Sequence, residues 1–147
     1  MQILNKTLEF KTRDRYDFID FTKEVQSFVK KSQIENGLIN IQTLHTTAAL
    51  ILNENEPLLL EDLKEHLEKI SPKDINYRHN DFSRRTVNVC KEECVNGHSH
   101  CQAIHLPPNL TLNITGGELQ LGQWQRIFLV ELDFSRLRKV QMQIIGE

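Results

Sequence analysis

Two glycines, Gly116 and Gly117, separate two segments in which apolar and polar side chains alternate. Residues 109–115, NLTLNIT, form the first segment, and the second begins at residue 118. A period of two places the apolar side chains on one face of a strand, and glycine accepts the positive φ that a tight hairpin turn requires. The pair therefore predicts an antiparallel hairpin. The alternating segment 139–145 predicts a further strand.

Two other segments have the spacing of amphipathic helices. Apolar side chains recur every three or four positions in residues 20–32, where Asp20 is a candidate cap, and in residues 57–70, which begin with a proline. A short third helix is expected over residues 96–106, before a pair of prolines. We therefore expect up to three helices among the strands.

The remaining segments complete the expected fold. Strands are predicted at residues 3–12 and 37–53, the latter as one long strand or two collinear ones. Residues 71–95 are polar and follow neither period, which is typical of a functional loop. We predict a single domain, residues 1–147, of the α+β class, in which two to three helices pack on a largely antiparallel sheet or sandwich.

The charge balance argues against nucleic acid as a partner. Eighteen Lys and Arg residues against twenty Asp and Glu residues give a formal net charge of −2, whereas nonspecific binding to a phosphate backbone needs a basic surface. No apolar run reaches the ~18 residues of a membrane span, and charges interrupt the first dozen residues, unlike a signal peptide. We expect a cytoplasmic protein with no membrane partner.

The segment LHTTAALILNENEP, residues 44–57, sets a histidine, two threonines and two glutamates around an apolar run. Strand alternation places His45 on the same face as Ile39, so its side chain is expected to be partly buried. A buried histidine is commonly a core residue bonded to the backbone. His79 and His100, however, lie in segments expected as loop or helix start. Three imidazoles can bind zinc and leave one position open, although their spacing matches no recognised ligand motif.

A structural zinc site is an alternative. Cys90, Cys94, His98 and His100 follow one another closely, but their spacing differs from the paired cysteines of usual zinc sites. On a helix, His98 and His100 lie on different stripes, so we expect them to have different roles. The third cysteine, Cys101, makes the number odd, and in a reducing compartment no disulfide framework is expected.

Acidic and basic side chains supply further candidates. Glu56 lies where its carboxylate would cap the helix that follows, whereas Glu54, nearer the histidine, is the better candidate for a general base. Thr46 and Thr47 offer hydroxyl groups that could help to hold an anion. The arginines considered for the same role are Arg84, Arg85 and Arg126.

Four segments together resemble the YjbQ family, a set of small proteins often labelled secondary thiamine-phosphate synthases. They are HTTAALILNENEP, YRHND, NGHSH and GGELQLGQWQRIFLVELD, in order between Leu38 and Gly146. The positions that match the family pattern are His45, Thr46, Glu54, Asp62, His79, His100, Gly122, Trp124 and Gln125. The sequence departs from the pattern at HLPPN, residues 105–109, and in its three cysteines.

The resemblance implies a polar pocket, a homotrimer, and a small-molecule or phosphate-bearing substrate. The enzyme would join two phosphorylated rings or carry out another metal-assisted transfer or hydrolysis; the alternative is a non-catalytic trimer that binds a metal or small anion. A divalent metal, zinc or magnesium, is the expected cofactor. The roles assigned are catalytic for Glu54, Asp62 and Thr46; binding for Thr47, Gln125, Trp124 and Arg126; and metal-ligating for His45, His79 and His100.

Overall fold

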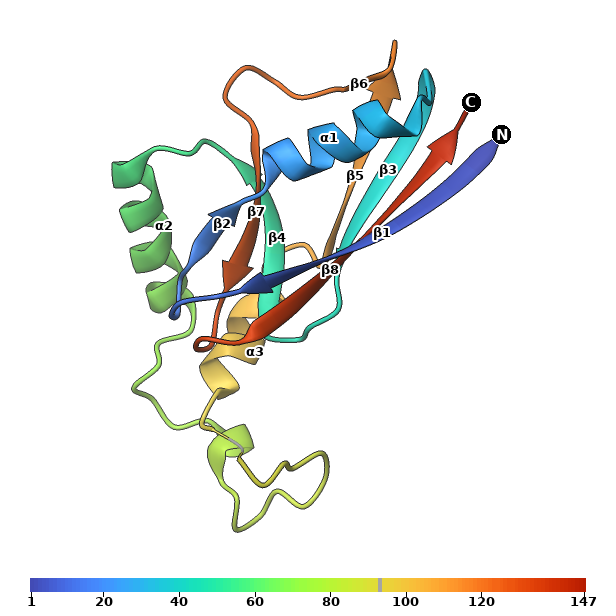
Figure 1. Cartoon of the computed structure of the whole chain (residues 1–147). Coiled ribbons are helices and arrows are strands. Elements are labelled where there is room, and N and C mark those ends of the chain that lie inside the picture. The colour runs from blue at the N-terminus through green and yellow to red at the C-terminus, as the bar shows by residue number, and fades with distance from the viewer. Residues whose placement is uncertain (93) are drawn as a thin grey trace.

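The computed structural model describes residues 1–92 and 94–147 and shows two antiparallel sheets with helices at their edges and between them (Figure 1). The larger sheet has the strand order β1-β8-β3-β5-β6 and the smaller one β2-β7-β4. The elements in chain order are β1 (Gln2–Lys11), β2 (Phe18–Asp20), α1 (Thr22–Ser32), β3 (Asn36–Thr43), β4 (Ala48–Asn53), α2 (Pro57–Ile70), the 3-10 turn η1 (Arg78–Asn80), α3 (Gly97–Ala103), β5 (Asn109–Thr115), β6 (Glu118–Leu119), β7 (Arg126–Glu131) and β8 (Leu137–Gly146).

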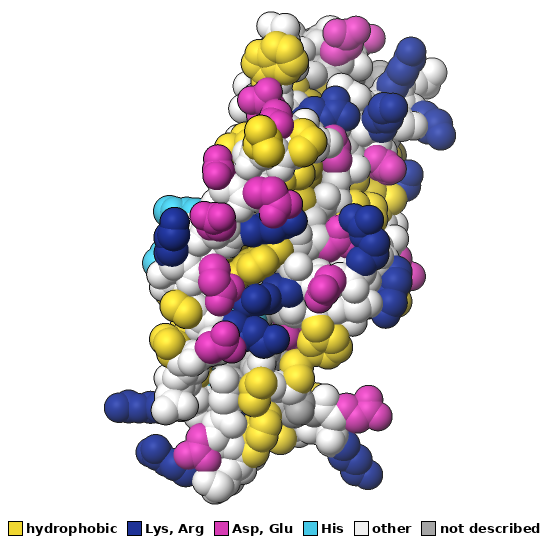
Figure 2. All heavy atoms as spheres, turned by 90° about the vertical axis from the view of Figure 1, so that its left-hand side faces the viewer, with side chains coloured by type: hydrophobic (Ala, Val, Ile, Leu, Met, Phe, Trp, Pro, Cys, Tyr) yellow, Lys and Arg dark blue, Asp and Glu magenta, His cyan; other side chains and the backbone are white. Residues whose placement is uncertain are grey.

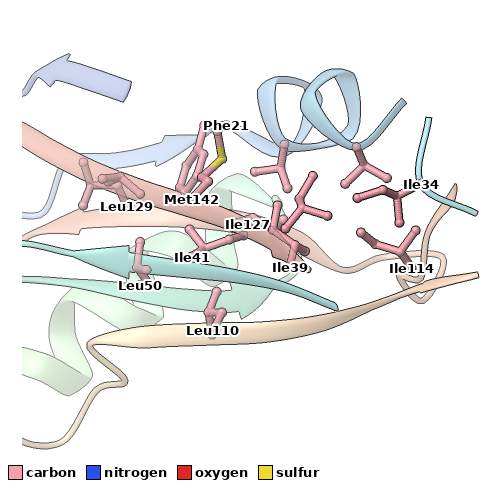
Figure 3. Packing of buried hydrophobic residues seen from close by; sticks show 14 of the residues in the cluster. Phe21, Ile34, Ile39, Ile41, Leu50, Leu110, Ile114, Ile127, Leu129 and Met142 are labelled. Carbon is pink, nitrogen blue, oxygen red and sulfur yellow. The ribbon is translucent and has the colours of Figure 1, made fainter. Parts of the chain in front are cut away.

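The hydrophobic core lies between the larger sheet, the smaller sheet and α1. Alternation within β3 and β8 directs Ile39, Ile41 and Met142 inward, where each is fully buried. Phe21, at the start of α1, packs in the same cluster, together with side chains from β4 and β7 (Figure 3). One apolar face of each sheet and that of α1 therefore share this core, and the other face of the smaller sheet packs against Leu67 of α2 in a second cluster.

The α+β class is confirmed, with three α-helices on antiparallel sheets. The predicted hairpin forms between β5 and β6, and both of its glycines have positive φ, 59° and 73°. The helix α2 spans the predicted 57–70, and the Glu56 carboxylate accepts hydrogen bonds from the backbone N–H groups of Leu58 and Leu59. This carboxylate therefore caps the helix, as expected.

The segment 37–53 differs from the expectation of one strand or two collinear ones. It breaks at residues 44–47, and its two halves join different sheets: β3 pairs with β5 and β8, whereas β4 pairs with β7. The predicted extent of the third helix is also wrong, because α3 ends at Ala103 and not at the prolines. Asp20 accepts a bond from the Thr22 N–H, but the N-cap position itself belongs to Phe21.

None of the helices in the described part of the chain is both long and apolar enough to cross a membrane.

Candidate functional site

A polar cavity of about 500 Å³ opens where the chain passes from one sheet to the other. Its walls come from four segments that are distant in sequence: the 44–47 connection, η1 with the loop that follows it, the start of α3, and the start of β8. The described lining residues are Leu44, His45, Thr46, Thr47, His79, Arg85, Asn88, Cys90, Glu92, Asn96, His100, Arg136 and Arg138.

The break between β3 and β4 fixes the position of His45. Its Nε2 accepts a hydrogen bond of 2.7 Å from the backbone N–H of Lys139, in the neighbouring strand β8. An imidazole nitrogen that accepts a hydrogen bond carries no proton, so the ring is neutral in this arrangement. Burial, and next the positive charge of Arg138, lower the pKa of His45 from its ordinary value. The site therefore keeps this histidine uncharged.

A buried ion pair forms the floor of the cavity. Arg138 donates from Nε to Glu131 at 2.7 Å and from Nη2 to the other carboxylate oxygen, and Nη2 also reaches the Thr47 hydroxyl at 2.9 Å. The side chains of Arg138 and Glu131 are only 4% and 0% exposed. A bidentate pair of this kind fixes the plane of the guanidinium group, so Arg138 is held rigidly.

A second arginine stands beside the first at the cavity wall. Arg136 donates to Asp133 at 2.7 Å and lies over the ring of Phe134, 4.0 Å from its centroid. The same Asp133 contacts Cys94, and burial followed by the Asp133 charge raises the pKa of the Cys94 thiol. This environment therefore favours the protonated thiol at Cys94.

The rings of His79 and His100 meet edge to face, with centroids 4.6 Å apart. Gly97 makes this approach of α3 and η1 possible, since a Cβ at that position would lie 2.5 Å from the Cβ of Tyr77. The Asn80 side chain accepts a bond from the Gly97 N–H and ties the two elements together. His79 Nε2 is buried and has no hydrogen-bond partner among the described residues. An unpartnered buried nitrogen is a candidate contact for a ligand.

Comparisons with known proteins identify relatives of this chain. The model of the family described as UPF0047 protein YjbQ-like matches residues 6–147. The chain belongs to the YjbQ family. A UPF0047 protein of Methanothermobacter thermautotrophicus is 33% identical over 147 residues, all of this chain and 95% of that protein, and YugU of Bacillus subtilis is 30% identical, over 96% and 98%.

Solved structures of similar proteins share the fold. The crystal structure of a YbjQ-like protein of unknown function from Sulfolobus solfataricus P2 superposes with a TM-score of 0.89 at 31% identity, over 99% of each chain. A hypothetical protein from Aeropyrum pernix K1 gives a TM-score of 0.85 at 32% identity, over 98% of this chain and 99% of that one.

Apart from Asp62, the residues that match the YjbQ pattern divide into two groups in space. His45, Thr46, His79 and His100 line the cavity described above, together with Thr47. Glu54, Trp124 and Gln125 line a separate, open pocket of about 450 Å³ at the far end of β4. The structure therefore does not bring Glu54 to the histidines.

Asp62 and Arg126 also lie outside the cavity. Asp62 is exposed on α2, and Arg126 donates to Asp20 at 2.9 Å. Trp124 is 64% exposed, so it is not a core residue. Sequence reasoning missed Arg136 and Arg138. The available signal was the alternation of β8, which places Arg138 on the same buried face as Val140.

The four-ligand zinc alternative does not form among the described residues, where no three or more His, Cys, Asp or Glu side chains converge as a metal site. His98 and His100 have different environments, as their helical positions predict. His98 is 2% exposed and its Nε2 lies 3.1 Å from the Ser99 hydroxyl, which donates to the Leu132 carbonyl. Because that hydroxyl proton is already used, Nε2 carries the proton and Nδ1 does not.

We expect the stability of the protein to fall below about pH 6.5, because of His98. Burial, and next the charge of Arg15, lower the pKa of His98, while the unfolded chain takes up this proton below about pH 6.5. The free energy of unfolding is therefore lost as the pH falls, by at most about 1.4 kcal/mol per pH unit for one proton. Urea unfolding at pH 5 to 8 should show that the advantage of wild type over His98→Gln shrinks toward low pH. An advantage that stays constant would contradict this role.

Proposed function

We propose that this chain is an enzyme that acts on a phosphate-bearing small molecule in the polar cavity. The observation that carries the proposal is the convergence, from four segments, of three arginines, two threonine hydroxyls and a pair of adjacent histidines on one cavity. Arginines and hydroxyl groups hold phosphate oxygens. Histidine is the most frequent group in general acid–base catalysis.

The electrostatics of the cavity favour an anion. Glu92 is the single acidic side chain among the described lining residues, against Arg85, Arg136 and Arg138. The carboxylates that balance Arg136 and Arg138 lie behind them in the protein, where both are buried. A charged cavity wall of this kind, partly shielded from water, stabilises negative charge more strongly than an exposed surface does.

The histidine pair would supply proton transfer. His79 and His100 come from different elements, and their edge-to-face contact places both rings at the same side of the cavity. A positioned imidazole that gives a proton to, or takes one from, a reacting oxygen typically contributes a factor of about 10² to 10⁴ to the rate. In this proposal the arginines bind the phosphate, and the histidines give a proton to the group that leaves or take one from the group that attacks.

Thiamine-phosphate synthesis is one reaction of this class. The phosphate groups of its two substrates suit the cavity. Their rings would need apolar or aromatic walls, and Leu44 is the single aliphatic side chain among the described lining residues, which include no Phe, Tyr or Trp. Hydrolysis or transfer on a smaller, more polar phosphate ester therefore fits the walls better.

We expect pyrophosphate to bind the wild-type protein and Arg85→Gln to weaken this binding by at least about tenfold, the value of a lost charge-assisted hydrogen bond. Isothermal titration calorimetry measures the change. Arg78→Gln is the matched control, because Arg78 lies on η1 next to His79 but faces a different pocket; its affinity should stay within about twofold. Equal weakening in both variants would exclude a specific contact.

Catalysis is tested separately, by phosphate release from a panel of phosphate and diphosphate esters that includes the two thiamine precursors. His100→Gln should lower kcat by about 100-fold or more and change ligand affinity by less than about threefold. Specific binding with no turnover of any ester would favour the alternative, a non-catalytic anion-binding protein.

A divalent metal is a second candidate participant in the same cavity. The buried, unpartnered Nε2 of His79, beside His100, fits a metal ligand. His45 fits less well, because its Nε2 is occupied by the Lys139 N–H. Two imidazoles would hold zinc only in part, and oxygens of substrate or water would complete the coordination. Such an ion would polarise a phosphoryl oxygen.

If the histidine pair holds a metal, elemental analysis by inductively coupled plasma mass spectrometry should find close to one zinc per chain, lost in His79→Gln with His100→Gln. His45→Gln should retain the metal in this proposal, because that ring is bonded to the backbone. Loss of zinc in His45→Gln to the same extent, or no metal in wild type purified without chelators, would contradict this assignment.

The chain also has a face that suits assembly into the homotrimer that the family resemblance implies. The outer surface of the larger sheet is uncovered by helices (Figure 1), and three rows of four residues across β1, β8, β3 and β5 contain no charged side chain. Charged residues are depleted in interface cores. The rows are Ile3, Ile145, Leu38, Asn113; Asn5, Gln143, Asn40, Thr111; and Thr7, Gln141, Gln42, Asn109.

This neutral face contrasts with the side that carries α2, where side chains of both signs are scattered over the surface (Figure 2). Amide side chains both donate and accept hydrogen bonds, so an array of Asn and Gln is complementary to a copy of itself. Copies of this chain are therefore the partners that we propose for the face.

In multi-angle light scattering, wild type should have a mass that is a multiple of 17.2 kDa, with a trimer expected. Gln141→Lys places a positive charge from each copy in the face that the assembly would bury. These like charges repel one another, so the variant should release 17.2 kDa monomers. Gln26→Lys, on the exposed surface of α1, is the matched control and should leave the mass unchanged. A monomeric wild type, or an assembly that tolerates Gln141→Lys, would rule out this interface.

A further inference from the structure

The hydrogen bond that His45 accepts also determines what its other nitrogen does. Because Nε2 accepts the Lys139 N–H, the proton of the neutral ring is on Nδ1. Nδ1 makes no hydrogen bond among the described residues, and it is not one of the buried unpartnered atoms, so it is accessible from the cavity that His45 lines. The ring therefore presents a donor, not a lone pair, to a ligand.

The hydrogen bonds of Arg138 likewise determine which of its nitrogens is left for a ligand. Its Nε and Nη2 groups are engaged by Glu131 and Thr47, whereas Nη1 makes no hydrogen bond among the described residues and is not buried without a partner. Nη1 is therefore the part of this buried side chain that reaches the cavity. Its two N–H groups have no acceptor from the described chain.

Glu131 holds the guanidinium group in this orientation. Its carboxylate, which is 0% exposed, accepts from Arg138, from the Thr12 hydroxyl at 2.9 Å and from the Asp133 N–H at 3.0 Å. With these partners the carboxylate is saturated and faces away from the ligand. Arg138 and His45 meet at the same point of β8, because His45 is bonded to the residue that follows Arg138.

Resting on the function proposed above, we infer that His45 Nδ1–H and Arg138 Nη1 together form the subsite that holds one oxyanion of the phosphate, with Glu131 and the Lys139 N–H as positioning groups. The subsite consists of donors. It therefore selects a ligand group whose oxygens only accept, a phosphate monoester dianion or a terminal diphosphate, over a group that must donate a hydrogen bond.

This assignment differs from a metal-ligating role for His45. A metal needs a nitrogen lone pair, and the single lone pair of the neutral ring is already used by the backbone. The two roles make opposite predictions for amide substitutions, because Asn places an N–H₂ donor near the position of Nδ1, whereas Gln places its amide near the position of Nε2.

The test uses sulfate, which stays a dianion across the pH range, as the probe in calorimetric titration of the full chain. His45→Asn should keep the affinity within about threefold, and His45→Gln, which keeps the Lys139 contact but loses the Nδ1 donor, should weaken it by about tenfold. Arg138→Lys, which keeps a charge beside Glu131 but has no Nη1, should also weaken it by about tenfold or more. Circular dichroism and urea unfolding confirm that each variant folds.

Measurements at several pH values separate a neutral donor from an imidazolium. The charged groups around His45 are Arg138, Glu131, Arg136 and Lys139, and the cavity also contains His79, His100, Arg85, Cys90 and Glu92. Dividing the dissociation constant of His45→Asn by that of wild type cancels the effects that these surrounding groups have on both proteins. This ratio should be constant from pH 6 to 9. A ratio that rises toward low pH would show that the charged ring binds and would overturn the inference.

The outcomes also distinguish this inference from the proposed function. If wild type binds neither sulfate nor pyrophosphate, the proposed function fails. If it binds both and Arg85→Gln weakens binding, but the two His45 variants bind equally well or equally poorly, the phosphate site stands and the Nδ1 donor is excluded. If His45→Gln behaves as expected and Arg138→Lys, shown to be folded, binds like wild type, the assignment of Nη1 is excluded.

Discussion

The buried ion pair between Glu131 and Arg138 is the interaction on which the site and the joining of the two sheets both depend. Glu131 ends β7 in the smaller sheet, and Arg138 belongs to β8 in the larger one. The pair is completed by Thr12, after β1, and by Thr47, before β4. Breaking a buried pair by removing one partner typically costs about 3 to 5 kcal/mol, because the remaining charge stays buried. Four segments are thus held in one arrangement by a polar cluster at the edge of an otherwise apolar core.

That cluster also explains why the cavity lies where it does. Residues 44–47 leave the larger sheet at Thr43 and enter the smaller one at Ala48, and the space between these two points is lined by the start of β8. The backbone N–H of Lys139 is available to His45 because the pairing of β3 with β8 ends at Thr43 and Val140. The cavity lies between these strand ends. The ion pair ensures that the charges buried beside the cavity are paired.

Much of the fold followed from local sequence pattern. The helix 57–70 and the glycine hairpin were predictable because capping, leucine spacing and positive φ are properties of neighbouring residues. The break at 44–47 was not, since β4 pairs with β7, almost 80 residues later, and no local signal records that choice. For the site, the resemblance identified His45, His79 and His100, which do share a cavity. The tautomer of His45 and the role of Arg138 depend on contacts that cross sheets, and they required the structure.

The connection 44–47 belongs to neither sheet, and this has an evolutionary consequence. The strand pairs on both sides of it are set by β5, β7 and β8, so they do not constrain the side chains at residues 44–46, whereas Thr47 is constrained by its hydrogen bond to Arg138. Substitutions at these three positions change the chemistry of the cavity while every strand keeps its register. A chain of this fold can therefore acquire a new ligand through a few substitutions at residues 44–46, while the hydrophobic core stays the same.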